Sequence, residues 1–306
     1  MSAAAQDGPV ECCVAIPCRT DEPALGATLA AVWREWCATA AGIDPPPLDV
    51  LVCLNGPDPE RGPAAADAER FAAAHHDQGA HVRVLPLPVA GKARAWNVLR
   101  RAATGPVTVF VDADVEIGAG TIPRLVAALA SAPQATVATP RTRCAPRPGF
   151  FESVMAAPYA VSFPNLSGQL YAARTAALPL AMPECLLEPE RWLELVLGPA
   201  RVVHVPDATV VVRLPATLRD FVRQRVRIEM GKVQLRCDFP GLLPRSARQP
   251  GARQALGALD PATLVRLGIY VALREACHVV AACRHRAVEE PSAWPQATST
   301  KRWAGR

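Results

Sequence analysis

Short apolar runs alternate with stretches of helical periodicity along the first half of the chain. The runs that we predict to be strands are residues 10–16, 48–54, 81–85 and 107–111, and a predicted helix follows each of them. This alternation favours a mainly parallel sheet, because a parallel connection needs a crossover that is usually a helix. We therefore predict an α/β fold with a mainly parallel central sheet and helices on both faces. Pro17 is expected to stop the first strand.

The apolar run Val107–Val111 ends in two carboxylates, Asp112 and Asp114. In an open α/β sheet the ligand crevice lies at the carboxyl ends of the strands, and residues i and i+2 of an extended segment project to the same side. Both carboxylates can therefore face one cation. Hard divalent ions such as Mg²⁺ or Mn²⁺ prefer oxygen ligands and keep positions open for substrate phosphates. In the alternative interpretation the two acids only begin a polar loop.

A lysine stands at the start of the predicted helix 92–103, in the sequence Gly91-Lys-Ala-Arg-Ala-Trp-Asn97. A cation in the first turn opposes the helix dipole, so this placement favours an anion bound near Lys92. Lysine is used at only two other positions, 232 and 301, which gives this position more weight. Asn97 either contacts a ligand or only bridges the loop.

In their order and spacing, Gly91-Lys92, Asn97 and Asp112-Ala-Asp114 resemble the family 2 glycosyltransferases, nucleotide-sugar enzymes of the GT-A fold. The resemblance extends over about residues 10 to 235. It implies that the two aspartates hold Mg²⁺ or Mn²⁺ against the diphosphate of the donor. It also implies that Asp21, Asn55 and Lys92 contact the nucleotide.

Two of these contacts have simpler interpretations. Asp21 lies between a predicted strand and a predicted helix, where it could equally be the N-cap of the helix. In the family, the turn at Asn55-Gly-Pro57 usually carries an acid that recognises the base or ribose; Leu54 stands where that acid is often found, and Asn55 is the nearest polar group. Asn-Gly-Pro is also a good tight turn without any ligand.

The second half of the chain carries the acceptor-side features of the resemblance. The segment 165–174 resembles the family's segment in which a glycine precedes a strand beneath the acceptor site. The family then carries Glu-Asp at a helix start, and that Asp is the general base for the acceptor hydroxyl. The spacing puts Glu190 on the Asp position and Pro189 on the Glu position, and Glu188 is close enough to substitute. Acids in a first helical turn are also common for dipole reasons alone.

A basic segment further on contains Gln224-x-x-Arg227, which resembles the family's Gln-x-x-Arg-Trp motif with Ile228 in place of Trp. Residues at i and i+3 share one helix face, so Gln224 and Arg227 could hold a pyrophosphate or an acceptor. The alternative is a solvated basic helix face. The missing Trp argues against a processive polymerase.

We divide the chain into a GT-A domain at 1–238 and a C-terminal helical extension at 239–306, made of a linker, an amphipathic helix and a tail. The domain comprises a nucleotide-sugar-binding half, 1–116, and an acceptor-binding half, 117–238. On the predicted helix, apolar side chains recur on one side and basic side chains supply positive charge: Leu264, Leu267, Tyr270, Val271 and Val279, with Arg266, Arg274, Arg284 and Arg286. Such a helix packs on the domain or lies on an anionic membrane surface.

Composition excludes some classes of function. The net charge of +5 is too small for this length to indicate a nucleic-acid partner. The ten cysteines lack the spacing of a structural zinc site, and reduced thiols in a cytosol are the simplest interpretation. The N-terminus is unlike a signal peptide, and no run reaches the ~18 to 20 apolar residues of a spanning helix. We expect a cytoplasmic protein, with peripheral contact at the inner membrane face as the alternative.

The resemblance implies an inverting, metal-assisted glycosyltransferase that moves a sugar from a nucleoside-diphosphate sugar to a hydroxyl of a lipid-linked, glycan or small-molecule acceptor. A non-catalytic nucleotide-sugar-binding protein on the same fold is one alternative, because Pro189 replaces a family acid. A nucleotidyltransferase is the other. That class needs a glycine-rich basic loop directly after the first strand, and residues 17–22 contain no glycine.

Overall fold

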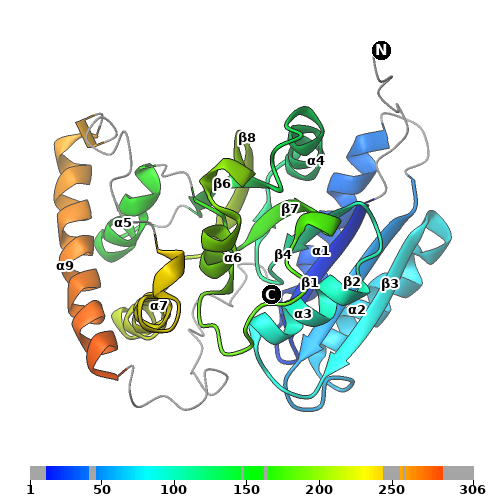
Figure 1. Ribbon diagram of the computed structural model, residues 1–306, viewed down its shortest axis with the longest axis horizontal. Helices are drawn as coiled ribbons and strands as arrows, with labels where there is room; N and C mark the ends of the chain where they lie inside the picture. Colours follow the sequence, from blue (N-terminus) through cyan, green and yellow to red (C-terminus); the bar gives the residue numbers. More distant parts are fainter. Residues whose placement is uncertain are drawn as a thin grey trace.

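One eight-stranded sheet forms the centre of the protein (Figure 1). The computed structural model describes residues 12–40, 46–145, 148–161, 165–243, 256–257 and 259–284. The strands are β1 (Cys12–Arg19), β2 (Leu48–Asn55), β3 (Ala80–Leu87), β4 (Val107–Val111), β5 (Glu116–Ile117), β6 (Val137–Cys144), β7 (Leu170–Arg174) and β8 (Val202–Val212). The main helices are α1 (Leu25–Cys37), α2 (Pro63–His75), α3 (Lys92–Ala102), α4 (Thr121–Ser131), α5 (Phe150–Ala156), α6 (Pro189–Leu197), α7 (Leu218–Asp238) and α9 (Pro261–Arg284).

The strand order is β3-β2-β1-β4-β7-β6-β8-β5. The first four strands along the sheet are parallel, as are β6 and β8, whereas β7 runs antiparallel to both of its neighbours and β5 runs antiparallel to β8. The predicted α/β fold with a mainly parallel sheet is therefore confirmed, and the second half of the sheet is mixed. Because β7 runs against β4, its first residues lie at the carboxyl end of β4.

The first strand continues beyond the position at which we expected it to stop. Pro17 pairs with Cys53 of β2, and β1 ends at Arg19. The pairing with β4 extends only as far as Ala15, so from there on β1 has a partner on one side alone. A proline is tolerated in such an edge-like stretch because the N–H that it lacks is not needed by a second neighbour.

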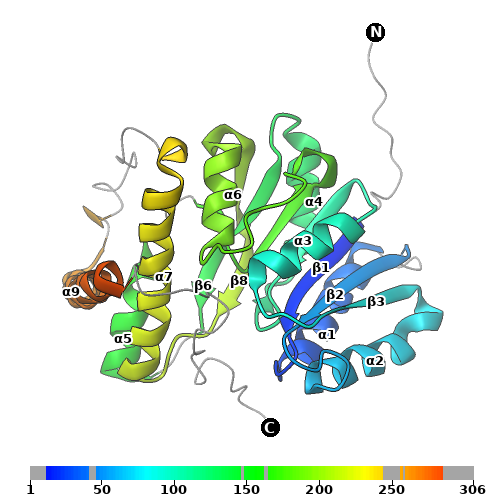
Figure 2. The same ribbon diagram turned by 60° about the horizontal axis from the view of Figure 1, so that its bottom comes forward.

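Both faces of the sheet are buried under helices (Figure 2). Successive side chains of β1 alternate between the two layers: Val14 and Ile16 face α1, α2 and α4, whereas Cys13 and Ala15 face α3 and α6. This two-sided burial explains why β1, β2 and β4 are almost continuously apolar in sequence.

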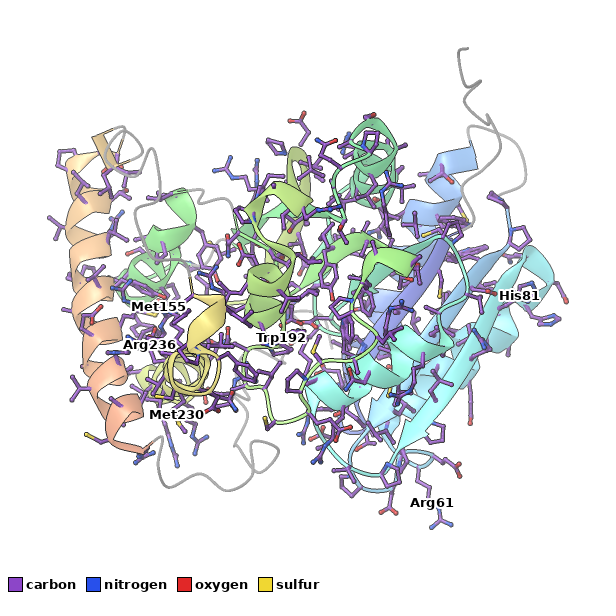
Figure 3. The ribbon with its side chains drawn as sticks, viewed as in Figure 1. Arg61, His81, Met155, Trp192, Met230 and Arg236 are labelled. Carbon is purple, nitrogen blue, oxygen red and sulfur yellow. The ribbon has the colours of Figure 1, made fainter. Side chains whose placement is uncertain are left out.

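The C-terminal helix α9 packs on α5 and α7. Its Tyr270, Leu273, Cys277 and Ala281 form a third apolar cluster with residues of those helices, and Met155 and Met230 lie at this end of the molecule (Figure 3). The interpretation that the helix packs on the domain is confirmed. The set of residues that we predicted for the apolar face of this helix was partly wrong, because the side chains of Leu264 and Val279 are exposed.

Some of the sequence predictions concern residues that the structure does not describe. Arg286, the tail that follows it and residues 244–255 of the linker lie outside the described residues. In the part of the chain that is described, none of the helices has both the length and the apolar character needed to cross a bilayer.

Candidate active site

A single ammonium group joins three distant parts of the chain at the carboxyl edge of the sheet. The Nζ atom of Lys92 lies 2.8 Å from a carboxylate oxygen of Asp112 and 2.7 Å from one of Glu190. It also donates a hydrogen bond of 2.8 Å to the carbonyl oxygen of Gly168. Lys92 opens α3, Asp112 follows β4, Gly168 precedes β7, and Glu190 stands in the first turn of α6. The structure thus brings together the lysine, the first aspartate and the candidate base.

Burial and neighbouring charges shift the pKa values of Asp112 and Lys92. Desolvation is the main reason why the pKa of Asp112 rises to about 7; Glu190 and Asp114 add to the rise, and the Lys92 ammonium opposes it. Burial alone would lower the pKa of Lys92, but the carboxylates of Asp112 and Glu190 outweigh it and hold that pKa above its usual value. The crowded carboxylates therefore favour the binding of further positive charge.

The predicted anion beside Lys92 is, in this structure, a pair of the protein's own carboxylates. Gly91, immediately before it, has a φ of 154°, which favours glycine. Its N–H donates a hydrogen bond of 3.1 Å to Oδ1 of Asn55. The Nδ2 atom of Asn55 in turn donates to the carbonyl of Cys18, at 2.7 Å. Asn55 thus uses both ends of its buried amide to fasten β1 and β2 to the loop that presents Lys92.

Asp21 lies in the loop after β1, at the same edge of the sheet as Asp112. Its carboxylate accepts two hydrogen bonds from Arg19, at 2.9 and 3.2 Å, and its side chain is 68% exposed. The interpretation of Asp21 as the helix N-cap is wrong, since α1 begins at Leu25. Glu22 is the acid at the helix start, where it accepts a hydrogen bond of 3.2 Å from the N–H of Ala24.

Asn97 is buried beneath the segment that leads to α6. It makes two hydrogen bonds with the backbone of Met182: Nδ2 donates to the carbonyl at 2.9 Å, and Oδ1 accepts from the N–H at 2.8 Å. Next to it, the ring of Trp96 stacks on Phe110, and Phe110 stacks on Tyr171. The indole N–H of Trp96 also donates a hydrogen bond of 2.7 Å to the hydroxyl of Tyr171. This aromatic layer ties α3 to β4 and β7 beneath Lys92 and Asp112.

Glu188 lies between the carboxylate cluster and α7. Burial raises its pKa to about 7, and the positive charges of Arg227 and Lys232 oppose that rise. Its side chain fills the space above Gly231, where an added Cβ would stand 2.4 Å from the Cγ of Glu188. The sequence alone did not single out Gly231, although a glycine inside a long helix is a signal of close packing.

A second residue of α7 that sequence reasoning missed holds the same segment. The Gln234 side chain accepts from the N–H of Leu187 at 3.1 Å and donates to the carbonyl of Cys185 at 3.0 Å. The two residues of the predicted pair on α7, Gln224 and Arg227, differ in their surroundings. The positive charge of Arg227 lowers the pKa of Glu188, whereas Gln224 is half-buried one turn earlier in the helix. The alternative of a solvated basic face fails for Arg225, which forms an ion pair with the buried Glu229.

Asp112 and Asp114 fit a hard divalent ion that takes most of its ligands from elsewhere. Among the described residues, no group of three or more His, Cys, Asp or Glu side chains could hold a metal. Two half-buried carboxylates at a strand end match instead the way Mg²⁺ is bound, through one or two carboxylates together with substrate phosphates and water. The backbone between them is held by Thr28, whose hydroxyl donates a hydrogen bond of 2.8 Å to the carbonyl oxygen of Ala113.

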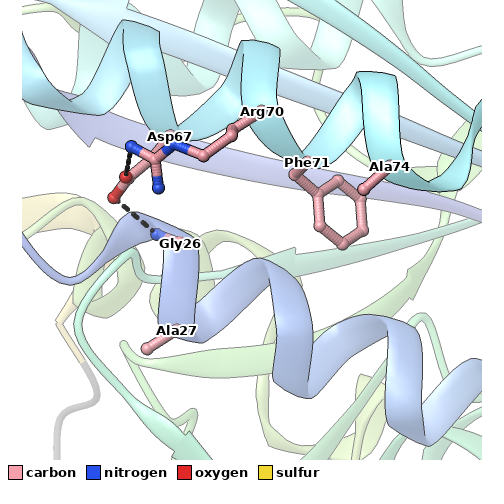
Figure 4. A pocket seen from close by; sticks show the side chains of 6 residues that line it. All are labelled: Gly26, Ala27, Asp67, Arg70, Phe71 and Ala74. Atoms are coloured by element: carbon pink, nitrogen blue, oxygen red, sulfur yellow. Dashed lines mark hydrogen bonds and ion pairs between the residues drawn. The ribbon is translucent and has the colours of Figure 1, made fainter.

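A hollow of about 390 Å³ between α1 and α2 lies apart from these residues (Figure 4). It is lined by Gly26, Ala27, Asp67, Arg70, Phe71 and Ala74. The carboxylate of Asp67 already accepts hydrogen bonds from the N–H of Gly26, at 3.0 Å, and from Arg70, at 2.9 Å. We interpret this hollow as a groove between packed helices, because all of its lining residues belong to α1 and α2 and none is a predicted site residue.

Comparison with known proteins places the chain in a family. No curated protein matches it. Among solved structures, a mannosyltransferase from Pyrobaculum calidifontis in complex with GDP-Man and Mn²⁺ is 20% identical, with a TM-score of 0.61 over 93% of this chain and 89% of that chain. Mannosyl-3-phosphoglycerate synthase from Rubrobacter xylanophilus is 13% identical, with a TM-score of 0.50 over 78% and 77%. These likenesses concern the fold. The sequence model of glycosyl transferase family 2 matches residues 13–175, more than half of the chain, and the protein therefore belongs to that family.

Proposed function

We propose that this glycosyltransferase transfers a sugar from a nucleoside-diphosphate sugar to an acceptor hydroxyl with inversion and with the help of a divalent metal. The observation that carries this proposal is the bridge formed by Lys92 between Asp112 and Glu190. It joins the predicted diphosphate side of the site to the predicted base at the start of α6. A single displacement needs the leaving group and the base around one anomeric carbon.

The donor side of the proposed site consists of Asp112, Asp114 and Lys92. The two aspartates would hold Mg²⁺ or Mn²⁺, which, when bound, neutralises charge on the departing diphosphate. The Mn²⁺ in the related mannosyltransferase structure supports a divalent ion. Asp21 and Asn55 are proposed to contact the nucleotide, Asn55 also by holding the loop at Gly91.

The acceptor side centres on Glu190, whose side chain is only 13% exposed. An incoming diphosphate competes for the Lys92 ammonium and thereby releases the Glu190 carboxylate. Glu190 then takes the proton of the acceptor hydroxyl, the hydroxyl oxygen bonds to the anomeric carbon, and the bond from that carbon to the diphosphate breaks. Glu188 is the second candidate, because a pKa near 7 suits a general base.

The remaining predicted residues are also assigned to the donor side or the acceptor side of the site. Gln224 and Arg227 are proposed to act on the pyrophosphate or the acceptor, and Asn97 to act through the segment at Met182. We propose residues 1–238 as the GT-A domain, with halves 1–116 and 117–238, and residues 239–306 as the helical extension. The acceptor is lipid-linked, a glycan or a small molecule. Ten free cysteines favour a reducing, cytoplasmic location.

Calorimetry with a panel of nucleoside-diphosphate sugars, with Mn²⁺ and with a chelator, tests the proposal. We expect one donor to bind in a Mn²⁺-dependent manner, and transfer to give a product of inverted anomeric configuration by NMR. Replacing both Asp112 and Asp114 with Asn should reduce donor affinity to the metal-free value. Asp77→Asn, at an exposed acid, is the matched control.

Two results would contradict parts of this proposal. Equal donor affinity in the double variant and the wild type would refute the metal assignment. Donor binding without hydrolysis or transfer to any acceptor would favour the non-catalytic binding protein.

A further inference from the structure

The helix α9 is apolar on two faces. One face packs on α5 and α7 through Tyr270, Leu273, Cys277 and Ala281. A second face, which we call the outer stripe, consists of exposed residues: Val265, Ile269, Ala272, Ala276, Val279 and Cys283. The exposed fraction is 64% for Val265, 36% for Ile269 and 62% for Val279. In Figures 1 and 2, α9 lies at the margin of the molecule, with α5 and α7 on its inner side.

The spacing of the outer stripe is that of a helix–helix seam. Its members follow one another at intervals of four, three, four, three and four residues, and no charged residue stands among them. Repeats of three and four residues keep a narrow apolar line along one side of a helix, where it can interlock with a second helix. A surface helix needs only one such face for its own core.

The order of the residues in the stripe is self-complementary. If two copies of α9 lie antiparallel, with the two-fold axis crossing the seam at the level of residue 274, Val265 meets Cys283, Ile269 meets Val279, and Ala272 meets Ala276. The large side chains then fill the two ends of the contact, and the alanines allow close approach at its centre. A two-fold symmetric interface requires a patch that complements itself.

We propose that the outer stripe of α9 pairs with the same stripe of a second copy of this chain, antiparallel, to form a two-fold symmetric dimer. A membrane surface is the less favoured occupant, because interfacial helices carry Trp, Phe or Leu over their apolar face and Lys or Arg beside it. The stripe itself is made of Val, Ile, Ala and Cys and holds no Trp, Phe or Leu, and the only basic side chains of α9 besides His278 are those of Arg266, Arg274 and Arg284.

One helix pair makes a small interface, below about 1,200 Å² in total, which is typical of weak or transient association. The dimer should therefore form with a dissociation constant on the order of micromolar. Sedimentation velocity of the full chain from about 1 to 200 μM should show the mass rising from 32.5 kDa towards twice that value. A monomer throughout this range would overturn the proposal.

A charge pair tests the antiparallel arrangement. Ile269→Lys should weaken the dimer at least about tenfold, because it places an unpaired cation in the apolar seam. Adding Val279→Glu to the same chain should restore the dimer, since position 269 of one copy faces position 279 of the other. A parallel pair would instead juxtapose like charges, so failure of this rescue overturns the arrangement.

Control variants distinguish this dimer from non-specific association and from membrane binding. Leu180→Lys, at a residue that is 82% exposed elsewhere, should leave the dimer unchanged. The thermal unfolding midpoints of all variants should stay close to that of the wild type, because the substituted side chains lie at the surface. A dimer that is insensitive to Ile269→Lys would refute the proposal. So would a monomer that sediments with vesicles of phosphatidylglycerol and phosphatidylcholine and loses this binding on Ile269→Lys, since the membrane would then be the occupant. None of these results depends on the proposed transfer reaction.

Discussion

Substitution of Gly231 by alanine should impair the reaction far more than it impairs the fold. Gly231 lies in the interior of α7, where the side chain of Glu188 occupies the space that a Cβ would take. An alanine Cβ would stand 2.4 Å from the Cγ of Glu188 and 3.2 Å from the Cβ of Leu187. Atoms of these types need about 3.5 Å or more, so the segment that carries Glu188 must move by roughly 1 Å.

Two opposing contributions decide the stability of this variant. Replacing glycine by alanine inside a helix gains about 1 kcal/mol. Overpacking a closed site costs about 1–3 kcal/mol. The free energy of unfolding should therefore fall by no more than about 2 kcal/mol, which urea unfolding can measure. The segment leads directly into Pro189 and Glu190, and a misplacement of about 1 Å in a catalytic site can lower the rate by about 10²-fold.

Steady-state transfer rates and urea unfolding should be measured for the same preparations. Gly268→Ala is the matched control, because Gly268 lies in α9 and has no atom within 4 Å of its added Cβ. That variant should be as active as the wild type and slightly more stable. If Gly231→Ala is also fully active and gains the same stability, the proposed contact between α7 and Glu188 does not position the base.

Two further predictions concern the acids of the site. Glu190→Gln should leave donor affinity intact and lower the transfer rate by roughly 10² or more, measured under single-turnover conditions; the same loss in Glu188→Gln with an active Glu190→Gln would show that Glu188 is the base. Because the folded protein raises the pKa of Glu188 from 4.5 to about 7, folded chains bind more protons than unfolded chains between those values. Glu188 should therefore contribute a loss of stability as the pH rises from about 4.5 to 7, and urea unfolding across this range should show a flatter profile for Glu188→Gln than for the wild type.

Local patterns were enough to predict the first four strands along the chain, the two carboxylates that follow β4 and the helix that starts at residue 189. The run Val107–Val111 is apolar at nearly every position because both faces of its strand are covered, and the acids that follow it must lie at the sheet edge. Pro189 stands at the first position of α6, where its missing N–H has no cost, so Glu190 falls in the first turn as the spacing indicated.

The contacts that define the site depended on the tertiary structure. Lys92 meets Glu190 only because β7 inserts antiparallel beside β4 and brings Gly168 to the same edge, and no local periodicity encodes that strand order. The same holds for Asn55, whose amide joins Cys18 to Gly91, and for Gly231, whose missing side chain makes room for Glu188. Sequence patterns report which side chains are buried or exposed along one element. They do not report which distant element a polar group will meet, because those pairings are decided when the layers pack together.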